Sequence, residues 1–242
     1  MKLITTYSRS HECFYDEWFM PSLQDDYEVQ SCRNDIEGGG SFMSSDWTES
    51  VLFKAHTIID AIQNNWGELL VYSDVDVCFF SSTKQRILHA MHNRDIVLQV
   101  DDPAGNYCTG FFALRANEQT LSLWQRVAQA IPLQRRDQLA FNIIIRQMPE
   151  LRCGYLSREF FGTGTFLAEL WQPGIPFYIP WQPVMYHANW IIGIDSKLKA
   201  LQQADRIIRR GMPGILINNY RYYKIRRLRP YLADKAVDFM QK

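Results

Sequence analysis

The feature that most constrains the fold of this 242-residue chain is an uninterrupted apolar run that ends in two aspartates. Leu69–Tyr72 leads, after one serine, into Asp74-Val75-Asp76. A strand without alternating polar residues is typical of a sheet that is covered on both faces, as the parallel sheets of α/β proteins are. The run therefore predicts an inner strand with Asp74 and Asp76 at its carboxyl end.

Strands and helices alternate on both sides of this run. Further strands are expected at Leu3–Tyr7, Tyr27–Gln30, Ile96–Val100, Gly110–Arg115 and Leu151–Leu156. Helices are expected at Glu12–Phe19, 51–62, Gln85–Met91, Glu118–Ala130, Asp137–Arg146 and Ser196–Arg210, and the glycines at 38–40 predict a mobile loop. This order favours a doubly wound α/β sheet, with loops and short strands added between residue 162 and the last helix.

The composition fits one α/β domain and narrows the classes of partner. Hydrophobic residues make up 47% of the chain, which is enough for a single large core. Because 26 basic residues balance 26 acidic ones, no global field attracts nucleic acid. The five scattered cysteines favour reduced thiols over a disulfide framework. With neither a signal peptide nor a spanning segment in view, we expect a soluble cytoplasmic protein.

The aspartate pair lies where ligands gather in open α/β sheets, outside the carboxyl ends of the strands. Residues i and i+2 of an extended chain point to the same face, so Asp74 and Asp76 can both reach one hard cation that also holds diphosphate oxygens. An isolated Asp-x-Asp can equally end a strand in solvent. Paired charges directly after a buried strand are nevertheless costly unless water, a metal or a ligand satisfies them.

A second enzyme class shares this pattern. Haloacid-dehalogenase-type phosphatases place Asp-x-Asp after an apolar strand and use the first aspartate as a nucleophile, and Leu69–Val77 fits that description. Those enzymes normally carry the motif on their first strand, and they need a later Gly-Asp-x-x-x-Asp motif. Gly193-Ile194-Asp195 imitates that motif poorly, so the phosphatase interpretation ranks second.

Four segments match a single family in the right order: Tyr72–Val77, Cys108–Arg115, Asp137–Asn142, and His187–Trp190 with Gly193 and Lys197. Through them the chain resembles the nucleotide-diphospho-sugar transferases of glycosyltransferase family 77 and, more distantly, the retaining galactosyltransferases of family 8. The resemblance covers Leu3 to about Arg210. It implies a single-domain GT-A fold, which is a Rossmann-like mixed α/β sheet flanked by helices.

The resemblance also implies an activity. It is the metal-dependent transfer of a sugar from a nucleotide-diphosphate donor, with UDP-sugars favoured, to a glycan, lipid or protein acceptor, with retention of anomeric configuration. The implied cofactor is Mn²⁺ or Mg²⁺, and the implied metal ligands are Asp74, Asp76 and His187, with Asp74 also near the ribose. Imidazole and carboxylate together suit manganese. A GT-A-like domain that binds carbohydrate without turnover is the non-enzymatic alternative.

The remaining roles follow the same resemblance. Lys197 would hold the donor diphosphate, Gly193 would let the backbone approach it, and Lys54 is a weaker phosphate candidate. Thr5, Thr6 and Tyr7, at the end of the first strand, are candidates for the nucleotide-base pocket. Asp137 and Gln138 are the catalytic candidates, with Gln138 near the anomeric carbon and helix capping as the alternative for Asp137.

Several charged residues have no role in this scheme. Asp101 and Asp102 are expected in a solvated turn, although they could reach the sugar or the acceptor, and the four other histidines, His11, His56, His89 and His92, are expected at the surface or in packing. Residues 211–242 form a basic, tyrosine-rich extension. It could contact an anionic membrane surface or an acceptor, or could simply be a solvated helix face.

Overall fold

The computed structural model describes residues 1–36, 45–164 and 171–240, without the side chains of 45, 46 and 228–240. The predicted glycine loop at 38–40 lies outside these ranges. A six-stranded sheet has the order β2-β1-β3-β6-β5-β7. Its strands are β1 Lys2–Ser8, β2 Glu28–Asn34, β3 Leu69–Ser73, β5 Ile96–Val100, β6 Tyr107–Arg115 and β7 Cys153–Tyr155.

The sheet is mixed, as the family resemblance predicted. β1 runs parallel to β2 and β3, and β5 runs parallel to β7, whereas β6 is antiparallel to both of its neighbours. The central β3 is buried along Leu70–Ser73. The apolar run of β3 therefore indicates that both faces of the sheet are covered. It does not indicate the direction of the neighbouring strands, because one of them is antiparallel.

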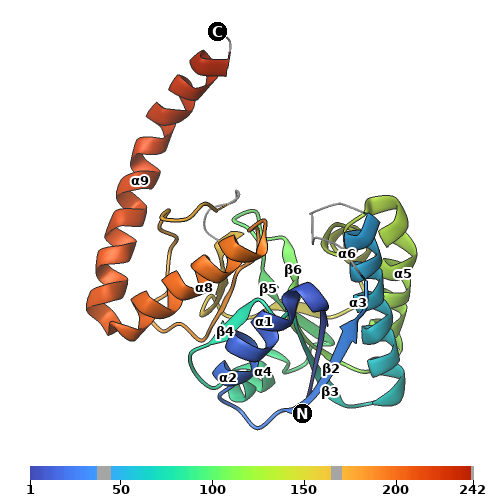
Figure 1. Cartoon of the computed structure of the whole chain (residues 1–242). Helices are drawn as coiled ribbons and strands as arrows, with labels where there is room; N and C mark the ends of the chain where they lie inside the picture. The colour runs from blue at the N-terminus through green and yellow to red at the C-terminus, as the bar shows by residue number, and fades with distance from the viewer. Residues whose placement is uncertain (37–44, 165–170, 241–242) are drawn as a thin grey trace.

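Helices cover both faces of the sheet (Figure 1). One layer contains α3 Ser45–Asn64, α5 Glu118–Gln134 and α6 Asp137–Ile145; the other side carries α1 Glu12–Phe14, α2 Met20–Ser22, α4 Lys84–Ala90 and α8 Ile194–Arg209. A 3₁₀ turn at Arg9–His11 and a π-helix at Tyr15–Phe19 complete the segment around α1. Successive strand residues point to opposite faces, so Leu70 packs in the core under α3 and α5 while Val71 packs in the other core.

A second, three-stranded sheet joins the first directly after the aspartate pair. It has the order β4-β9-β8, formed by β4 Val77–Phe79, β9 Met185–His187 and β8 Phe160–Gly162. β4 and β9 are antiparallel, and Val77 pairs with His187. The chain thus passes from one sheet to the other through Asp74–Asp76, and the pairing delivers His187 to the same place.

The basic extension begins as a separate helix, α9, which spans Gly211–Met240 and projects from the body (Figure 1). Its first turns are nevertheless anchored. Asn218 and Asn219 are buried, and Asn219 both accepts a hydrogen bond from the Ile179 N–H (3.0 Å) and donates one to the Ile179 carbonyl (2.8 Å). Asn218 donates to the Phe177 carbonyl. None of the described helices has both the length and the apolar composition needed to span a bilayer.

We expect Asn219→Ala to lower the free energy of unfolding by about 2–4 kcal/mol, because it leaves two buried backbone groups of Ile179 without partners. Urea unfolding followed by circular dichroism measures the change. The neighbouring side chain of Tyr220 is 70% exposed, so Tyr220→Ala is the control and should change the free energy by less than about 0.5 kcal/mol. Equal stability of the two variants would contradict the anchoring role.

Candidate active site

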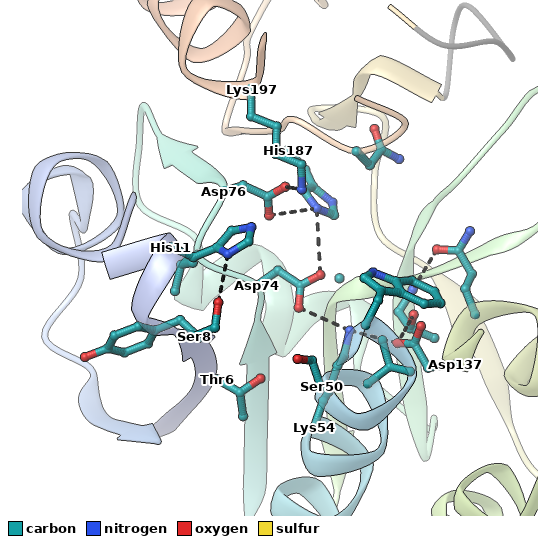
Figure 2. A pocket seen from close by; sticks show the side chains of 18 of the residues that line it. Thr6, Ser8, His11, Ser50, Lys54, Asp74, Asp76, Asp137, His187 and Lys197 are labelled. Carbon is teal, nitrogen blue, oxygen red and sulfur yellow. Dashed lines mark hydrogen bonds and ion pairs between the residues drawn. The ribbon is translucent and has the colours of Figure 1, made fainter. Parts of the chain in front are cut away.

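A cavity of about 550 Å³ opens where β1 and β3 end (Figure 2). The end of β1, the start of α6, the loop after β9 and the first turn of α8 all contribute to its lining. Of the predicted site residues, the cavity is lined by Thr6, Tyr7, Lys54, Asp74, Asp76, Asp137, Gln138, His187, Gly193 and Lys197. The fold therefore gathers residues from almost 200 positions of sequence around one space.

Asp74, Asp76 and His187 form a cluster with the composition of a metal site. One ligand atom from each lies within 4.8 Å of the others. The His187 Nε2 atom is 3.3 Å from Asp76 Oδ1 and 3.9 Å from Asp74 Oδ2. The prediction that His187 lies beside the aspartates is confirmed.

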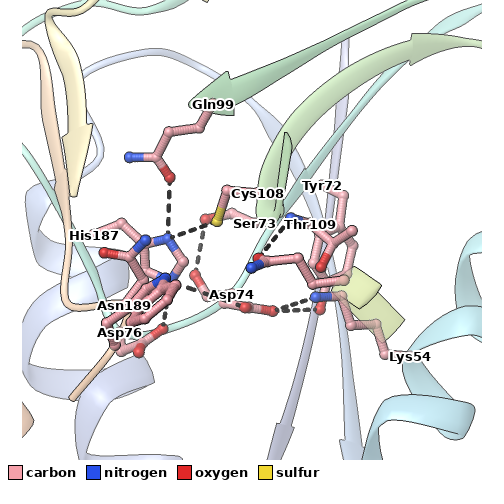
Figure 3. A network of polar contacts seen from close by, with 12 residues as sticks. Lys54, Tyr72, Ser73, Asp74, Asp76, Gln99, Cys108, Thr109, His187 and Asn189 are labelled. Carbon is pink, nitrogen blue, oxygen red and sulfur yellow. Dashed lines mark hydrogen bonds and ion pairs between the residues drawn. The ribbon is translucent and has the colours of Figure 1, made fainter. Parts of the chain in front are cut away.

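Two polar side chains contact the ring nitrogen of His187 that faces away from the aspartates and set the orientation of the ring (Figure 3). Its Nδ1 atom lies 3.0 Å from Gln99 Oε1 and 3.6 Å from Cys108 Sγ. An amide oxygen only accepts hydrogen bonds, so Nδ1 carries a proton and Nε2 is the ring atom that faces the carboxylates. Gln99 and Cys108 are fully buried and fix the ring as partners of metal-bound histidines do. The donor set therefore fits a divalent cation.

Lys197 supplies a positive charge that pairs with the cluster. Its Nζ atom lies 2.7 Å from Asp76 Oδ2. Burial raises the pKa of Asp76, but Lys197 and His187 outweigh it and hold that pKa far below the usual range. Burial lowers the pKa of His187, but the Asp76 carboxylate and Cys108 together outweigh the effect of burial and raise that pKa to about 10. Without a cation, Nε2 therefore carries a proton at neutral pH.

We expect Mn²⁺ affinity to rise about tenfold per pH unit between pH 6 and 8, because a cation can bind Nε2 only after its proton leaves. The sign follows from the raised pKa of His187, which keeps the ring protonated throughout this window. Calorimetry in buffers of different ionisation enthalpy should count about one proton released per ion. The control His187→Gln should bind Mn²⁺ more weakly and should not release this proton on binding. A pH-independent affinity in the unaltered protein would contradict the assignment.

Lys54 joins the metal cluster to the catalytic candidates. Its Nζ atom lies 3.1 Å from Asp74 Oδ1 and 3.0 Å from Asp137 Oδ2, and its side chain is buried. These two contacts place Lys54 between the carboxylates, so Lys54 positions both of them, and its role toward the donor phosphate stays a prediction. Asp137 also accepts from Thr109 Oγ1 (2.9 Å) and is the first residue of α6, whose N-cap is Arg136. Asp137 is therefore not the N-cap residue, although its carboxylate lies in the first turn of α6, where the helix dipole favours it.

Gln138 reaches the cavity next to a buried acid. Its Nε2 atom donates to Asp101 Oδ2 at 2.7 Å, and Asp101 Oδ1 accepts from Asn189 and Trp190. Burial raises the pKa of Asp101 to about 7. The solvated turn expected for Asp101 is therefore wrong. The expected turn is found at Asp102, whose side chain accepts hydrogen bonds from backbone N–H groups of that turn.

The end of the cavity next to Lys197 lies at the N-terminus of α8. Gly193 precedes α8 with φ +87°, a conformation that glycine adopts without strain, and the first turn of α8 lines the cavity. Unpaired N–H groups and the helix dipole make such a terminus favourable for phosphate. His11 also lines this end and bonds to Ser8 Oγ at 3.0 Å (Figure 2). Sequence reasoning missed His11 because no motif spacing marks it.

Thr6 and Tyr7 line the cavity, but Thr5 does not. Thr5 points to the same face of β1 as Leu3 and is fully buried, so its predicted contact with a nucleotide base is wrong. Thr6 Oγ1 is 2.7 Å from the Tyr72 hydroxyl, which donates to Asp74 Oδ1. Tyr7 stacks on Tyr15 at 4.6 Å between ring centroids. The two remaining candidates therefore form one edge of the site.

Gly110 allows the cluster to form, because a Cβ atom there would lie 2.9 Å from His187 Nε2 and 2.7 Å from Asp74 Oδ2. We expect Gly110→Ala to weaken Mn²⁺ binding about 10–100-fold by displacing these ligands. Calorimetry measures the affinity. The control Gly154→Ala makes the same change in β7, where the three atoms nearest to the new Cβ belong to the flexible Arg94 side chain, and it should bind Mn²⁺ normally. Unchanged binding by the Gly110 variant would contradict the proposed ligand positions.

Comparison with solved structures identifies the fold as that of GT-A glycosyltransferases. The apo-form glycosyltransferase GlyE of Streptococcus pneumoniae TIGR4 has a TM-score of 0.52 and 9% identity, with 82% of this chain and 59% of that one covered. A glycosyltransferase involved in glycosylation of the major capsid of PBCV-1 has a TM-score of 0.54 and 10% identity, with coverage of 84% and 100%.

Sequence comparison gives the family. The profile of nucleotide-diphospho-sugar transferases matches residues 11–201, so the chain belongs to the nucleotide-diphospho-sugar transferase family. The uncharacterized protein At1g28695 of Arabidopsis thaliana is 27% identical over 92 residues, which are 38% of this chain and 27% of that protein. The chain thus spans about a quarter of that relative.

The phosphatase interpretation loses support at two points. The aspartate pair follows β3 and not the first strand of the chain. Asp195, which would begin the second acidic motif, is exposed in the first turn of α8 and does not line the cavity.

Proposed function

We propose that the protein is a metal-dependent, retaining glycosyltransferase that uses a UDP-sugar. The observation that carries the proposal is the convergence of Asp74, Asp76 and His187 on one cavity, beside Lys197 and the N-terminus of α8. Two carboxylates and an imidazole match Mn²⁺ or Mg²⁺ by ligand type, with nitrogen favouring Mn²⁺. The family membership supports a nucleotide-sugar donor.

Each part of the donor has a matching part of the cavity. The diphosphate would lie between the cluster and the first turn of α8, with Lys197 moving from Asp76 to a phosphate oxygen. The bound cation would supply charge that stabilises the departing diphosphate. Thr6 and Tyr7 would border the nucleoside, since they line the cavity at the end of β1.

The sugar would lie against Gln138. In the proposed step the bond from the anomeric carbon to the diphosphate oxygen breaks, the acceptor oxygen bonds to the same face, and its proton passes to the leaving phosphate. The Gln138 amide would support the oxocarbenium-like sugar without becoming a strong nucleophile. Asp101 restrains that amide, and Asp137 borders the same end of the cavity. This route needs no dedicated base.

The acceptor would be a glycan, a lipid or a protein. The enzyme would be cytoplasmic and would contact an anionic membrane through its basic segment. Arg221, Lys224, Arg226 and Arg227 lie on α9 outside the donor cavity. We therefore assign them to the acceptor or to a membrane surface, and not to donor chemistry.

A panel of UDP- and GDP-sugars separates the enzyme from a carbohydrate-binding domain without turnover. Slow release of nucleoside diphosphate in the presence of Mn²⁺, abolished by a chelator, is expected of the enzyme. The panel also identifies the sugar, which depends on cavity shape. Metal and nucleotide binding without any release would instead favour the binding domain.

We expect Asp76→Asn to keep the fold and to lower the affinity for UDP in the presence of Mn²⁺ by at least about tenfold, because the amide keeps the shape but loses the charge that holds the cation. Calorimetry measures the affinity, and circular dichroism checks the fold. Asp195→Asn is the matched control, since Asp195 is exposed and does not line the cavity. Undiminished affinity of the Asp76 variant would remove its metal role.

A further inference from the structure

A second cavity of about 430 Å³ lies away from the donor site, between α9 and the segments before β8 and β9. Its lining includes Arg158, Tyr178, Trp181, Tyr222, Tyr223 and Arg226, together with Glu159. None of these residues lines the first cavity. The donor scheme therefore leaves this cavity without a role.

Three tyrosines form an aromatic wall in this cavity. Tyr222 and Tyr223 meet edge to face at 5.2 Å between ring centroids, and Tyr178 meets each of them at 6.1 Å. Trp181 and Tyr223 are about half exposed, at 48% and 50%. Aromatic surface that stays partly uncovered beside polar groups suits a ligand with both an apolar face and polar edges.

The hydrogen bonds that anchor the first turns of α9 also hold the tyrosine wall in place. Tyr178 stands between Phe177 and Ile179, whose backbone groups bond to the buried Asn218 and Asn219. These contacts order the segment against α9 before any ligand binds. A preformed wall of this kind reduces the entropy lost on binding.

The cavity also carries positive charge. Arg158 and Arg226 line it, and in the described part of the chain no carboxylate pairs with either guanidinium. Glu159 does not offset them, because its carboxylate pairs with Arg86 (3.1 Å) and accepts from Ser157. Arg226 donates to the Tyr222 hydroxyl at 3.1 Å, which keeps it at the aromatic wall. A carboxylate or phosphate group is the complementary ligand chemistry.

The position of the cavity links it to the donor site. Glu159 directly precedes β8, and Gly162 at the far end of β8 pairs with His187. Three residues of strand correspond to about 10 Å. That separation is too large for the cavity to be part of the donor site, but an oligosaccharide of a few sugar units could span it.

We propose that this cavity binds an acidic saccharide and holds the acceptor chain of the transferase. The acceptor role rests on the proposed function, whereas saccharide binding does not. Sugar rings present apolar C–H faces to the tyrosine wall and hydroxyl edges to its phenols, and the acidic group pairs with Arg158 and Arg226. Flat membrane surfaces and simple polyanions lack this combination.

Direct binding tests the proposal without any donor. Calorimetry with a galacturonic acid hexamer should show binding, whereas the neutral maltohexaose should bind at least about tenfold more weakly, since charged hydrogen bonds are lost. Hexaglutamate carries comparable charge without sugar rings and should also bind weakly. Binding of hexaglutamate, or of phosphatidylglycerol vesicles, at least as tight as that of the galacturonate hexamer would overturn the proposal.

Single variants locate the binding. Arg158→Ala, Arg226→Ala and Tyr223→Ala should each weaken hexamer binding about tenfold or more and leave Mn²⁺ and UDP affinity unchanged. Tyr220→Ala on α9 and Arg206→Ala on α8 are matched controls, because both residues are exposed and neither lines the cavity. Thermal unfolding confirms that the variants fold. Equal binding by variants and controls would overturn the site.

The two proposals can fail separately. Donor release with Mn²⁺ but no hexamer binding would leave the glycosyltransferase intact and overturn the second site. Hexamer binding that depends on Arg158 and Tyr223, in a protein that releases no nucleotide from any donor, would support the saccharide site and overturn the proposed function.

Discussion

The arrangement of the site depends on the burial of one carboxylate, Asp76, between two sheets. Its side chain is 6% exposed, a location in which an unpaired charge is strongly destabilising. Lys197 from α8 and His187 from β9 supply the compensating charge. A backbone hydrogen bond joins the same two segments, because the Ala188 N–H donates to the Asp76 carbonyl. These contacts offset the cost of burying the Asp76 carboxylate where the chain turns from β3 into β4.

The same logic extends to the other half of the cavity. Asp137 is also buried, and Lys54 satisfies it while contacting Asp74. Lys54 thereby connects the cluster expected to hold the cation with the residues expected to face the sugar. Because each lysine is shared or held by a carboxylate, replacing one residue of the network should disturb its neighbours as well. Single substitutions in this region will not have additive effects.

Much of the fold and site could be predicted from sequence, for identifiable reasons. The buried run before Asp74 and the helical periodicity of residues 51–62 gave β3 and α3, because both elements are long enough to show a pattern. The three-residue strand β4 shows no period, and its pairing with β9 joins positions more than a hundred residues apart. His187 was predicted through the family resemblance and not through any local signal.

Errors at the site came from burial and from contacts between distant segments. Thr5 is fully buried, whereas Thr6 and Tyr7, which are closer to the end of β1, line the cavity. Asp101 follows an apolar strand just as Asp74 does, but the sequence before it does not show that Trp190 and Asn189 will cover it. Lys54 lines the cavity as predicted, but the sequence did not show that it also bridges Asp74 and Asp137, because Asp137 is distant from it in sequence.

The charge balance of the cavity suggests why donor and cation should bind together. Within this network, Asp74, Asp76 and Asp137 lie beside three positive groups, namely Lys54, Lys197 and the protonated His187. A divalent cation held by the cluster would add two charges while His187 would lose its proton, so the network would gain one positive charge. A diphosphate at the first turn of α8 would offset that gain and would replace Asp76 as the partner of Lys197. The ion pairs that stabilise the fold would therefore also favour an anionic donor together with the cation.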